Sequence, residues 1–197
     1  MKARVGVLIS GAGSNMAALV DAGRAPEAAF EVVCVISNDP QAGGLGVAQT
    51  KGVPVGVLDH RPYAADRESH ERAIQTALEA YGVEVVALAG YMRLLTPWLI
   101  ERWRGRLLNI HPSLLPLYPG LKTHARALEA GDTEAGCTVH LVTEDVDAGP
   151  VLAQARVPIL PDDTESSLAQ RVLAEEHRLY PSALSAFCTN RNGASRS

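Results

Sequence analysis

The run of residues 83–89, Val-Glu-Val-Val-Ala-Leu-Ala, constrains the fold of this chain more than any other stretch. After Glu84, a strand built from these residues is apolar on both of its faces. A central strand of a parallel sheet needs apolar residues on both faces, because helices cover both sides of such a sheet. The run therefore predicts the interior of a parallel, helix-covered sheet.

Strands and helices are expected to alternate along the first two thirds of the chain. The expected strands are 4–10, 31–37, 53–58, 83–89 and one ending at 107–110, and the expected helices are 15–23, 40–51 and 64–81. This alternation is typical of a doubly wound α/β fold with helices on both faces of the sheet. After residue 135, two neighbouring strands at 136–142 and 150–157 predict an antiparallel edge, and hence a mixed, mostly parallel sheet.

The last predicted element is a long helix from about 164 to 186. Leu168, Val172 and Leu179 form one apolar line on it, and Glu176 falls on the same line. That carboxylate either finds a partner or a cavity inside the protein or lies at an exposed edge, and both alternatives stay open. We expect a single domain over residues 1–188, followed by a polar, frayed tail at 189–197.

Composition narrows the classes of partner. The chain has 18 Lys and Arg against 22 Asp and Glu, a net charge of -4. This charge offers no basic field for a nucleic acid, although a local pocket for one phosphate stays open. No stretch approaches the length of a membrane span, and the N-terminus runs into a strand rather than a signal peptide. We expect a cytoplasmic protein without membrane contact.

Cysteine and histidine spacing gives no sign of a metal site. Cys34, Cys137 and Cys188 are far apart, which fits neither a disulfide framework nor a CxxC site. The six histidines include no H-E-x-x-H pattern. No metal is therefore expected.

Asn109 and His111 stand two residues apart at the end of a predicted strand. Side chains of a strand alternate between its faces, so both should point to the same side, and Pro112 keeps His111 extended. An amide donor beside a titratable ring can stabilise an oxyanion and move a proton. An ordinary buried Asn and His that satisfy backbone groups are the alternative.

The segment SGAGSN at 10–15 joins the first predicted strand to the first predicted helix. Glycines let a backbone approach a phosphate, and the helix N-terminus offers free amides to it. Met16 stands where a dinucleotide-binding fingerprint requires glycine, so a monophosphate suits the segment better. A purely structural turn is the alternative.

Two further loops are candidates for the lining of a site. The segment GYMRLL at 90–95 follows a buried strand, where it could sandwich a flat heterocycle or simply close over the core. In the acidic loop 143–150, Glu144 and Asp145 are expected to face solvent, whereas Asp147 is the candidate to turn inward. If Asp147 reaches His111, its charge should raise the pKa of the imidazole and fix its orientation.

Five motifs in order together resemble the glycinamide ribonucleotide formyltransferase family, over about residues 4–187. They are SGAGSN, LAGYMRLL, LLNIHPSLLPLYPG, TVHLVTEDVDAGPV and EEHRLYP. HPSLLP alone would indicate only the wider formyl-folate enzyme superfamily. The resemblance implies a formyltransferase-like, Rossmann-type fold that needs no metal. It also implies transfer of the formyl group of 10-formyltetrahydrofolate to the amine of 5'-phosphoribosylglycinamide, by direct attack through a tetrahedral intermediate.

The resemblance also implies a set of site residues. Catalytic roles fall on Asn109, His111 and Asp147, the residues already chosen above. Contacts with the nucleotide fall on Gly13, Ser14, Asn15 and Glu176. Contacts with the folate fall on Arg67, Met92, Arg93, Leu94, Leu95, Asn109, Thr143, Glu144, Asp145, Val146 and Asp147.

Two other functions stay open from the sequence. One is a formyltetrahydrofolate hydrolase that lacks its regulatory domain, and the other is a nucleotide-binding module without catalysis. A transfer-RNA formylase is disfavoured, because the chain is acidic and has no room for a further domain. The expected partners are small molecules, and a homodimer stays open.

Overall fold

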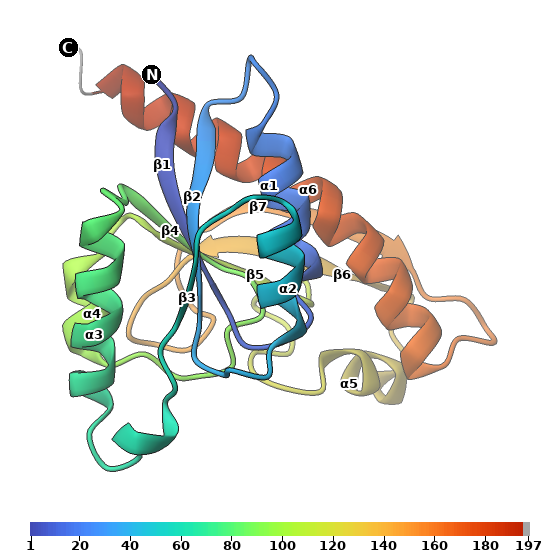
Figure 1. Cartoon of the computed structure of the whole chain (residues 1–197). Coiled ribbons are helices and arrows are strands. Elements are labelled where there is room, and N and C mark those ends of the chain that lie inside the picture. Colours follow the sequence, from blue (N-terminus) through green and yellow to red (C-terminus); the bar gives the residue numbers. More distant parts are fainter. Residues whose placement is uncertain (195–197) are drawn as a thin grey trace.

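One mixed sheet of seven strands organises the described part of the chain, residues 1–194 of a computed structural model (Figure 1). The strands are β1 (Ala3–Ile9), β2 (Phe30–Ser37), β3 (Val55–Val57), β4 (Val85–Leu88), β5 (Leu107–His111), β6 (Glu134–Leu141) and β7 (Val151–Pro158). The helices are α1 (Ser14–Gly23), α2 (Gly43–Thr50), α3 (Arg67–Ala80), α4 (Pro97–Arg102), α5 (Thr123–Ala130) and α6 (Glu165–Ala194), with a 3-10 turn η1 (Arg61–Tyr63).

The strand order is β3-β2-β1-β4-β5-β6-β7. Strands β1 to β5 pair in parallel, whereas β6 pairs antiparallel with both β5 and β7. In Figure 1, α3 and α4 lie on one side of the sheet, and α1, α2 and α6 lie on the other. The predicted α/β class, with a mostly parallel, mixed sheet and helices on both faces, is confirmed.

The two faces of the sheet carry separate apolar cores, as the run at 83–89 predicts. Val5, Val7 and Ile9 of β1 pack in the core that includes α1 and α6. Leu8, which points to the opposite face, packs in the core that includes Ile74 of α3. All four residues of β4 are buried.

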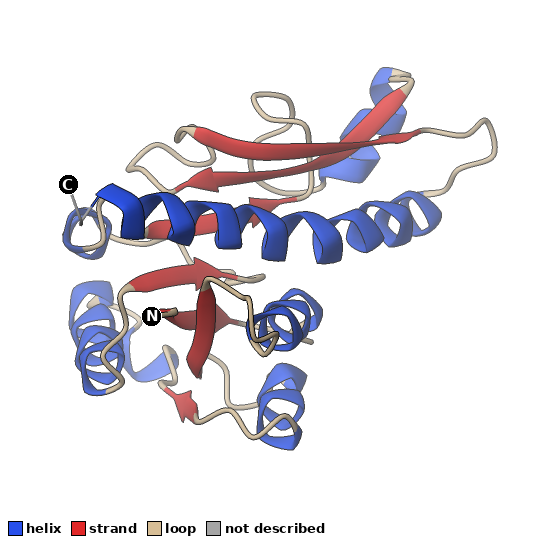
Figure 2. Cartoon of the chain, turned by 90° about the horizontal axis from the view of Figure 1, so that it is seen from above, coloured by secondary structure: helices blue, strands red, loops and turns tan. Residues whose placement is uncertain are grey.

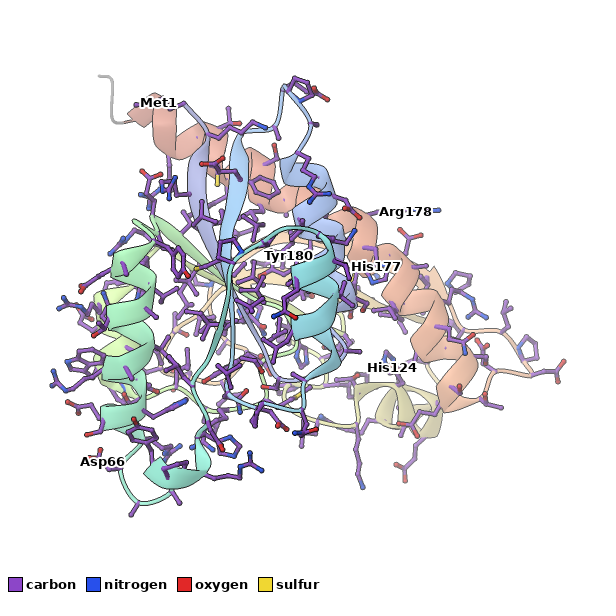
Figure 3. The ribbon with its side chains drawn as sticks, in the orientation of Figure 1. Met1, Asp66, His124, His177, Arg178 and Tyr180 are labelled. Carbon is purple, nitrogen blue, oxygen red and sulfur yellow. The ribbon has the colours of Figure 1, made fainter. Side chains whose placement is uncertain are left out.

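The long helix α6 lies along the sheet (Figure 2), and Tyr180 fastens it to the centre of the sheet (Figure 3). Its side chain is fully buried, and its hydroxyl lies 3.0 Å from the carbonyl oxygen of Leu88 and 3.2 Å from that of Leu108. Burial raises the pKa of this hydroxyl far above its usual range, so it stays a donor. The hydroxyl therefore ties α6 to both β4 and β5.

The chain beyond residue 188 differs from the expectation. Helix α6 runs on to Ala194, so the predicted tail is wrong for residues 189–194, and residues 195–197 lie outside the described range. Leu184 and Cys188 are buried in the core, and the Thr189 hydroxyl donates to the Ser185 carbonyl. The helix therefore continues through the polar residues after 188, because the buried residues Leu184 and Cys188 anchor the turns that precede them.

The short helices α4 and α5 have no counterpart in the sequence-based prediction. Helix α4 has six residues and α5 has eight, too few to show a clear 3.6-residue period. A long-range contact supports α4: the buried carboxylate of Glu71 on α3 accepts hydrogen bonds from the backbone and hydroxyl groups of Thr96. Of the helices in the described range, none is long and apolar enough to cross a membrane.

The strand order creates a crevice between the ends of β1 and β4. These two strands are neighbours, but the chain continues from β1 toward β2 and from β4 toward β5, which lie in opposite directions. The loops after them therefore diverge, and such a switch point is where open α/β sheets bind ligands. The loops at 10–13 and 89–96 flank it.

Replacing Tyr180 by Phe should lower the free energy of unfolding by about 1–2 kcal/mol, because the carbonyls of Leu88 and Leu108 lose a buried donor. Urea denaturation measures the change. Tyr81→Phe is the matched control, since the Tyr81 hydroxyl has no hydrogen bond to any described residue; its stability should stay within about 0.5 kcal/mol of the wild type. Equal stability of the two variants would contradict the role of Tyr180.

Candidate active site

Asn109 and His111 lie on one face at the carboxyl end of β5, as their spacing predicts. The antiparallel neighbour β6 brings a third polar side chain to them, because His140 pairs directly with Asn109. The amide nitrogen Nδ2 of Asn109 lies 3.2 Å from Nε2 of His140. His140 is almost fully buried, so this contact is shielded from water.

The contacts of His140 indicate which ring nitrogen carries a proton and which one can accept a hydrogen bond. Nδ1 lies 2.9 Å from the carbonyl oxygen of Leu141, and a carbonyl only accepts, so Nδ1 carries the proton. In the neutral ring Nε2 then accepts an N–H from Asn109. Among the described residues, no other group accepts from the Asn109 amide, so its second N–H is available to a ligand.

The carboxylate of Asp147 points inward between two imidazoles. Its Oδ2 lies 3.3 Å from Nδ1 of His111, and its Oδ1 lies 3.6 Å from Nε2 of His140. The backbone φ at Asp147 is 54°, in the left-handed region that Asp tolerates better than most residues. Glu144 and Asp145 are exposed, so the prediction that Asp147 turns inward while the other two face solvent is confirmed.

Residues 118–120, in the loop between β5 and α5, complete the hydrogen bonds of this cluster. Nε2 of His111 donates to the carbonyl oxygen of Tyr118 over 2.9 Å. The backbone N–H of Gly120 donates to Oδ2 of Asp147 over 2.8 Å. Both nitrogens of His111 thus face oxygen acceptors, and only the protonated ring satisfies both of them.

The loop that follows His111 is held by side chains of β6 and β7. The Thr138 hydroxyl donates to the Ser113 carbonyl over 2.7 Å and accepts the Leu115 N–H over 3.1 Å. Nε2 of Gln154 donates to the Leu115 carbonyl over 2.8 Å. His111 therefore sits between a strand and a well-anchored loop.

Burial decides the net pKa of His111. Desolvation lowers the pKa of the imidazole, and the Tyr118 carbonyl and the charge of Asp147 raise it without overcoming that effect. The charge of Asp147 acts in the expected direction, but the expected net rise of the His111 pKa is wrong. The ring is buried too deeply for one carboxylate to outweigh the loss of water.

The balance is the opposite for Asp147. Burial alone would raise the pKa of its carboxyl group, but the contact with His140, the hydrogen bond from Gly120 and the positive charge that either imidazole carries when protonated outweigh burial. The net pKa lies below its usual range, so Asp147 is ionised at neutral pH. The cluster thus joins a permanent negative charge to a titratable ring.

The segment 10–15 forms a tight turn braced from behind by α2. Gly13 has φ 75° and caps α1, and a Cβ there would lie 2.8 Å from the Cα of Gly44. The Gly44 N–H donates to the Gly11 carbonyl over 3.0 Å. Two backbones in direct contact leave no room for a side chain at Gly13, so its predicted place in the turn has a steric reason.

Glu176 of α6 meets Asn15 at the start of α1. Nδ2 of Asn15 donates to Oε2 of Glu176 over 2.6 Å, and Glu176 is 6% exposed, which excludes the exposed-edge alternative. Burial raises the pKa of Glu176, and the hydrogen bond from Asn15 offsets part of that rise. The buried Oδ1 of Asn15 has no partner among the described residues, so it can accept from a ligand.

A cavity of about 240 Å³ lies against this turn. It is lined by Ser10, Gly11, Ala12, Gly13, Ser14, Asn15, Ala89, Gly90 and Met92. Asn109 pairs with Leu88, the residue before Ala89 in this lining. The cavity at the switch point therefore lies one strand away from the polar cluster.

The residues expected to contact the folate lie in three separate segments. Met92 and Leu94 are exposed at 72% and 61%, whereas Arg93 and Leu95 are half-buried. Arg67 is exposed at the start of α3, one turn before Glu71, which binds Thr96 at the end of the 90–95 loop. Thr143 is half-buried and Val146 is exposed, in the loop that carries Asp147.

Sequence reasoning missed His140, Gly44 and the backbone groups of Tyr118 and Gly120. His140 follows a predicted strand pattern, and only the register of β6 against β5 places it beside Asn109. Gly44 and the 118–120 segment act through backbone contacts, which no side-chain motif signals. Over residues 1–194, no three His, Cys, Asp or Glu side chains are grouped so that they could hold a metal ion.

Comparisons with known proteins agree with the sequence motifs. Residues 3–184 match the protein family described as formyl transferase. The phosphoribosylglycinamide formyltransferase of Escherichia coli is 44% identical over 185 residues, which cover 94% of this chain and 87% of that protein. The human trifunctional purine biosynthetic protein adenosine-3 is 46% identical over 93% of this chain, but the chain spans only 18% of its length.

Solved structures show the same likeness. A crystal structure of phosphoribosylglycinamide formyltransferase from Brucella melitensis has a TM-score of 0.91 and 53% sequence identity, and the match covers 95% of this chain and 96% of that one. Glycinamide ribonucleotide transformylase 1 from Symbiobacterium toebii has a TM-score of 0.93 and 46% identity, over 96% of this chain and 89% of that one.

Replacing Gly149 by Ala should destabilise the loop that carries Asp147. A Cβ at Gly149 would lie 1.8 Å from the backbone oxygen of Leu141, so the backbone must shift, and such overpacking costs about 1–3 kcal/mol. Urea denaturation measures this loss. Gly43→Ala is the control, because nothing lies within 4 Å of its Cβ position. Wild-type stability in Gly149→Ala would contradict the packing argument.

The imidazole of His111 should titrate below its ordinary pKa of about 6.5, because burial disfavours the charged ring. Asp147→Asn should lower this pKa further, since the carboxylate charge favours the protonated ring. A pH titration followed by NMR, with the signal assigned by loss in His111→Gln, measures both values. A higher pKa in Asp147→Asn than in the wild type would overturn the electrostatic assignment.

Proposed function

Because the chain belongs to the formyl transferase family, we propose that it transfers the formyl group of 10-formyltetrahydrofolate to the amine of 5'-phosphoribosylglycinamide. The products are formylglycinamide ribonucleotide and tetrahydrofolate. The observation that carries the proposal is the meeting of Asn109, His111 and Asp147, which come from two distant parts of the chain. The relatives named above, which match nearly the whole chain, support the same reaction.

In the proposed mechanism the amine attacks the formyl carbon directly. The former carbonyl oxygen then carries negative charge, and preorganised donors stabilise such an oxyanion. Asn109 has the N–H that His140 does not use, and the imidazolium of His111 supplies positive charge beside it. No covalent adduct with the enzyme forms.

His111 and Asp147 are assigned to the proton transfer. The lowered pKa leaves His111 mostly neutral at pH 7, so the ring can take the proton that the amine releases on attack. Asp147, 3.3 Å from Nδ1, stabilises the imidazolium that results. The proton then passes, directly or through a water, to the folate nitrogen as its bond to the formyl carbon breaks. The amine exchanges one N–H for an N–C bond, and the leaving nitrogen gains that hydrogen.

The cavity at the switch point suits the nucleotide. Its phosphate would bind the backbone amides of Gly13, Ser14 and Asn15, where the N-terminus of α1 favours an anion. Glu176 and the unpaired Oδ1 of Asn15 are acceptors for the hydroxyl or amine groups of the substrate. The substrate amine would then lie toward Asn109, which is one strand away.

We assign the folate to two loops, residues 90–95 after β4 and residues 143–147 after β6. Exposed Met92 and Leu94 offer apolar surface to a flat ring, together with Arg93 and Leu95 of the same loop. Backbone groups of the 143–147 loop would contact the pterin, and this places the formyl group near Asp147. Arg67 would meet the acidic end of the folate.

We place this activity in a single domain that includes α6 to Ala194. A cytoplasmic location and a homodimer stay predictions. The hydrolase and the non-catalytic binder differ from the proposed transferase in one measurable respect, the dependence of tetrahydrofolate release on the nucleotide.

Incubation with 10-formyltetrahydrofolate should release tetrahydrofolate only when 5'-phosphoribosylglycinamide is present. Asn109→Ala and His111→Ala should each lower kcat by roughly 100- to 1000-fold, with circular dichroism unchanged, because each removes a group that stabilises the oxyanion. Asn190→Ala, at an exposed position of α6, is the control and should keep full activity. Release without the nucleotide would indicate a hydrolase, no release would indicate a binder, and wild-type turnover in both alanine variants would refute the assigned roles.

A further inference from the structure

The hydroxyl of Ser10 joins the two loops that flank the switch point. Ser10 follows β1, and its Oγ accepts the backbone N–H of Met92 over 2.8 Å. The backbone N–H of Ser10 donates to the Gly90 carbonyl over 3.1 Å. Ser10 therefore holds the loop after β4 through both its backbone and its side chain.

A third segment fixes the orientation of this hydroxyl. Oγ of Ser10 donates to Oδ1 of Asn38, which follows β2, over 2.5 Å. Asn38 is 4% exposed, its Nδ2 lies 3.1 Å from Nδ1 of His60, and its backbone oxygen accepts the His60 N–H over 3.2 Å. With its one proton given to Asn38, the hydroxyl can only accept from Met92. The ends of β1, β2 and β4 are thus linked at one oxygen atom.

Ser10 also lies in the wall of the 240 Å³ cavity, together with residues of both loops. On the proposed function, residues 11–15 of this wall bind the nucleotide and residues 90–95 bind the folate. We propose that Ser10 is a positioning residue, whose hydroxyl holds these two loops at a fixed separation and so couples the binding of the two substrates. This inference rests on the proposed function.

Ser37, at the end of β2, is a serine whose hydroxyl makes only local contacts and is therefore a comparison for Ser10. Ser37 is fully buried at the end of β2, and its hydroxyl exchanges hydrogen bonds with the backbone of Asp39, two residues away. The hydroxyl of Ser10 instead contacts residues 28 and 82 positions away. Loss of the Ser37 hydroxyl should affect one turn, whereas loss of the Ser10 hydroxyl should remove the side-chain link between the two substrate loops and leave only the backbone bond to Gly90.

Calorimetric titration of 5'-phosphoribosylglycinamide, alone and with saturating tetrahydrofolate, measures the coupling. Tetrahydrofolate has no formyl group, so no turnover occurs. In the wild type it should tighten nucleotide binding by about fivefold or more. Ser10→Ala should reduce this factor by roughly two- to tenfold, the effect of one hydrogen bond. The affinity for the nucleotide alone should stay within about twofold of the wild type, because backbone groups of residues 11–15 are unchanged.

Three variants separate coupling from general loss of stability. Ser10→Thr keeps the hydroxyl and should restore the coupling. Asn38→Leu removes the acceptor without changing Ser10 and should weaken the coupling as Ser10→Ala does. Ser37→Ala, the matched control, should leave the coupling unchanged even where it lowers the unfolding temperature.

The outcomes distinguish this proposal from the proposed function. If both compounds bind the wild type but show no coupling, or if Ser10→Ala keeps the full coupling, the role of Ser10 is refuted and the transferase proposal stands. An equal loss of coupling in Ser37→Ala would also refute it, since the effect would then be general. If neither compound binds the wild type, both proposals fail.

Discussion

A carboxylate buried beside two imidazoles is the interaction on which the candidate site depends. A buried charge without partners is costly, and here the Gly120 N–H compensates for part of that cost, as do the rings of His111 and His140 when they are protonated. The compensation requires the ends of β5 and β6 and the loop before β7 to meet. It also requires a left-handed backbone at Asp147. The ionisation of Asp147, the orientation of its side chain and the conformation of the loop that carries it therefore depend on one another.

The second half of the site depends on the order of the strands. Because β1 and β4 are neighbours whose connections diverge, the loops after them face one another across a cavity. Helix α6 closes this region from the other end of the sequence, and Tyr180 holds it over β4 and β5 so that Glu176 reaches Asn15. Residues 161 positions apart thus share one hydrogen bond.

Local pattern predicted much of this arrangement. The two-sided apolar run at 83–89 indicated a covered parallel sheet, and β4 is buried throughout. The alternation of side chains in a strand placed Asn109 and His111 on one face. The same reasoning misjudged the net pKa of His111, because depth of burial does not follow from spacing. The predicted end of α6 at about residue 186 is too early. The helix continues to Ala194 because the buried residues Leu184 and Cys188 anchor the turns before its polar end.

Sequence by itself determined the fold class and the pair at the end of β5, and it marked Asp147 as the candidate to turn inward, because apolar period, strand alternation and turn residues are short-range properties of the chain. Only the tertiary structure decided that His140 stands beside Asn109, that Glu176 meets Asn15 and that Ser10 joins two loops. Each of these contacts depends on strand register or helix placement. Those are set by the packing of the whole core, and no local stretch of residues encodes them.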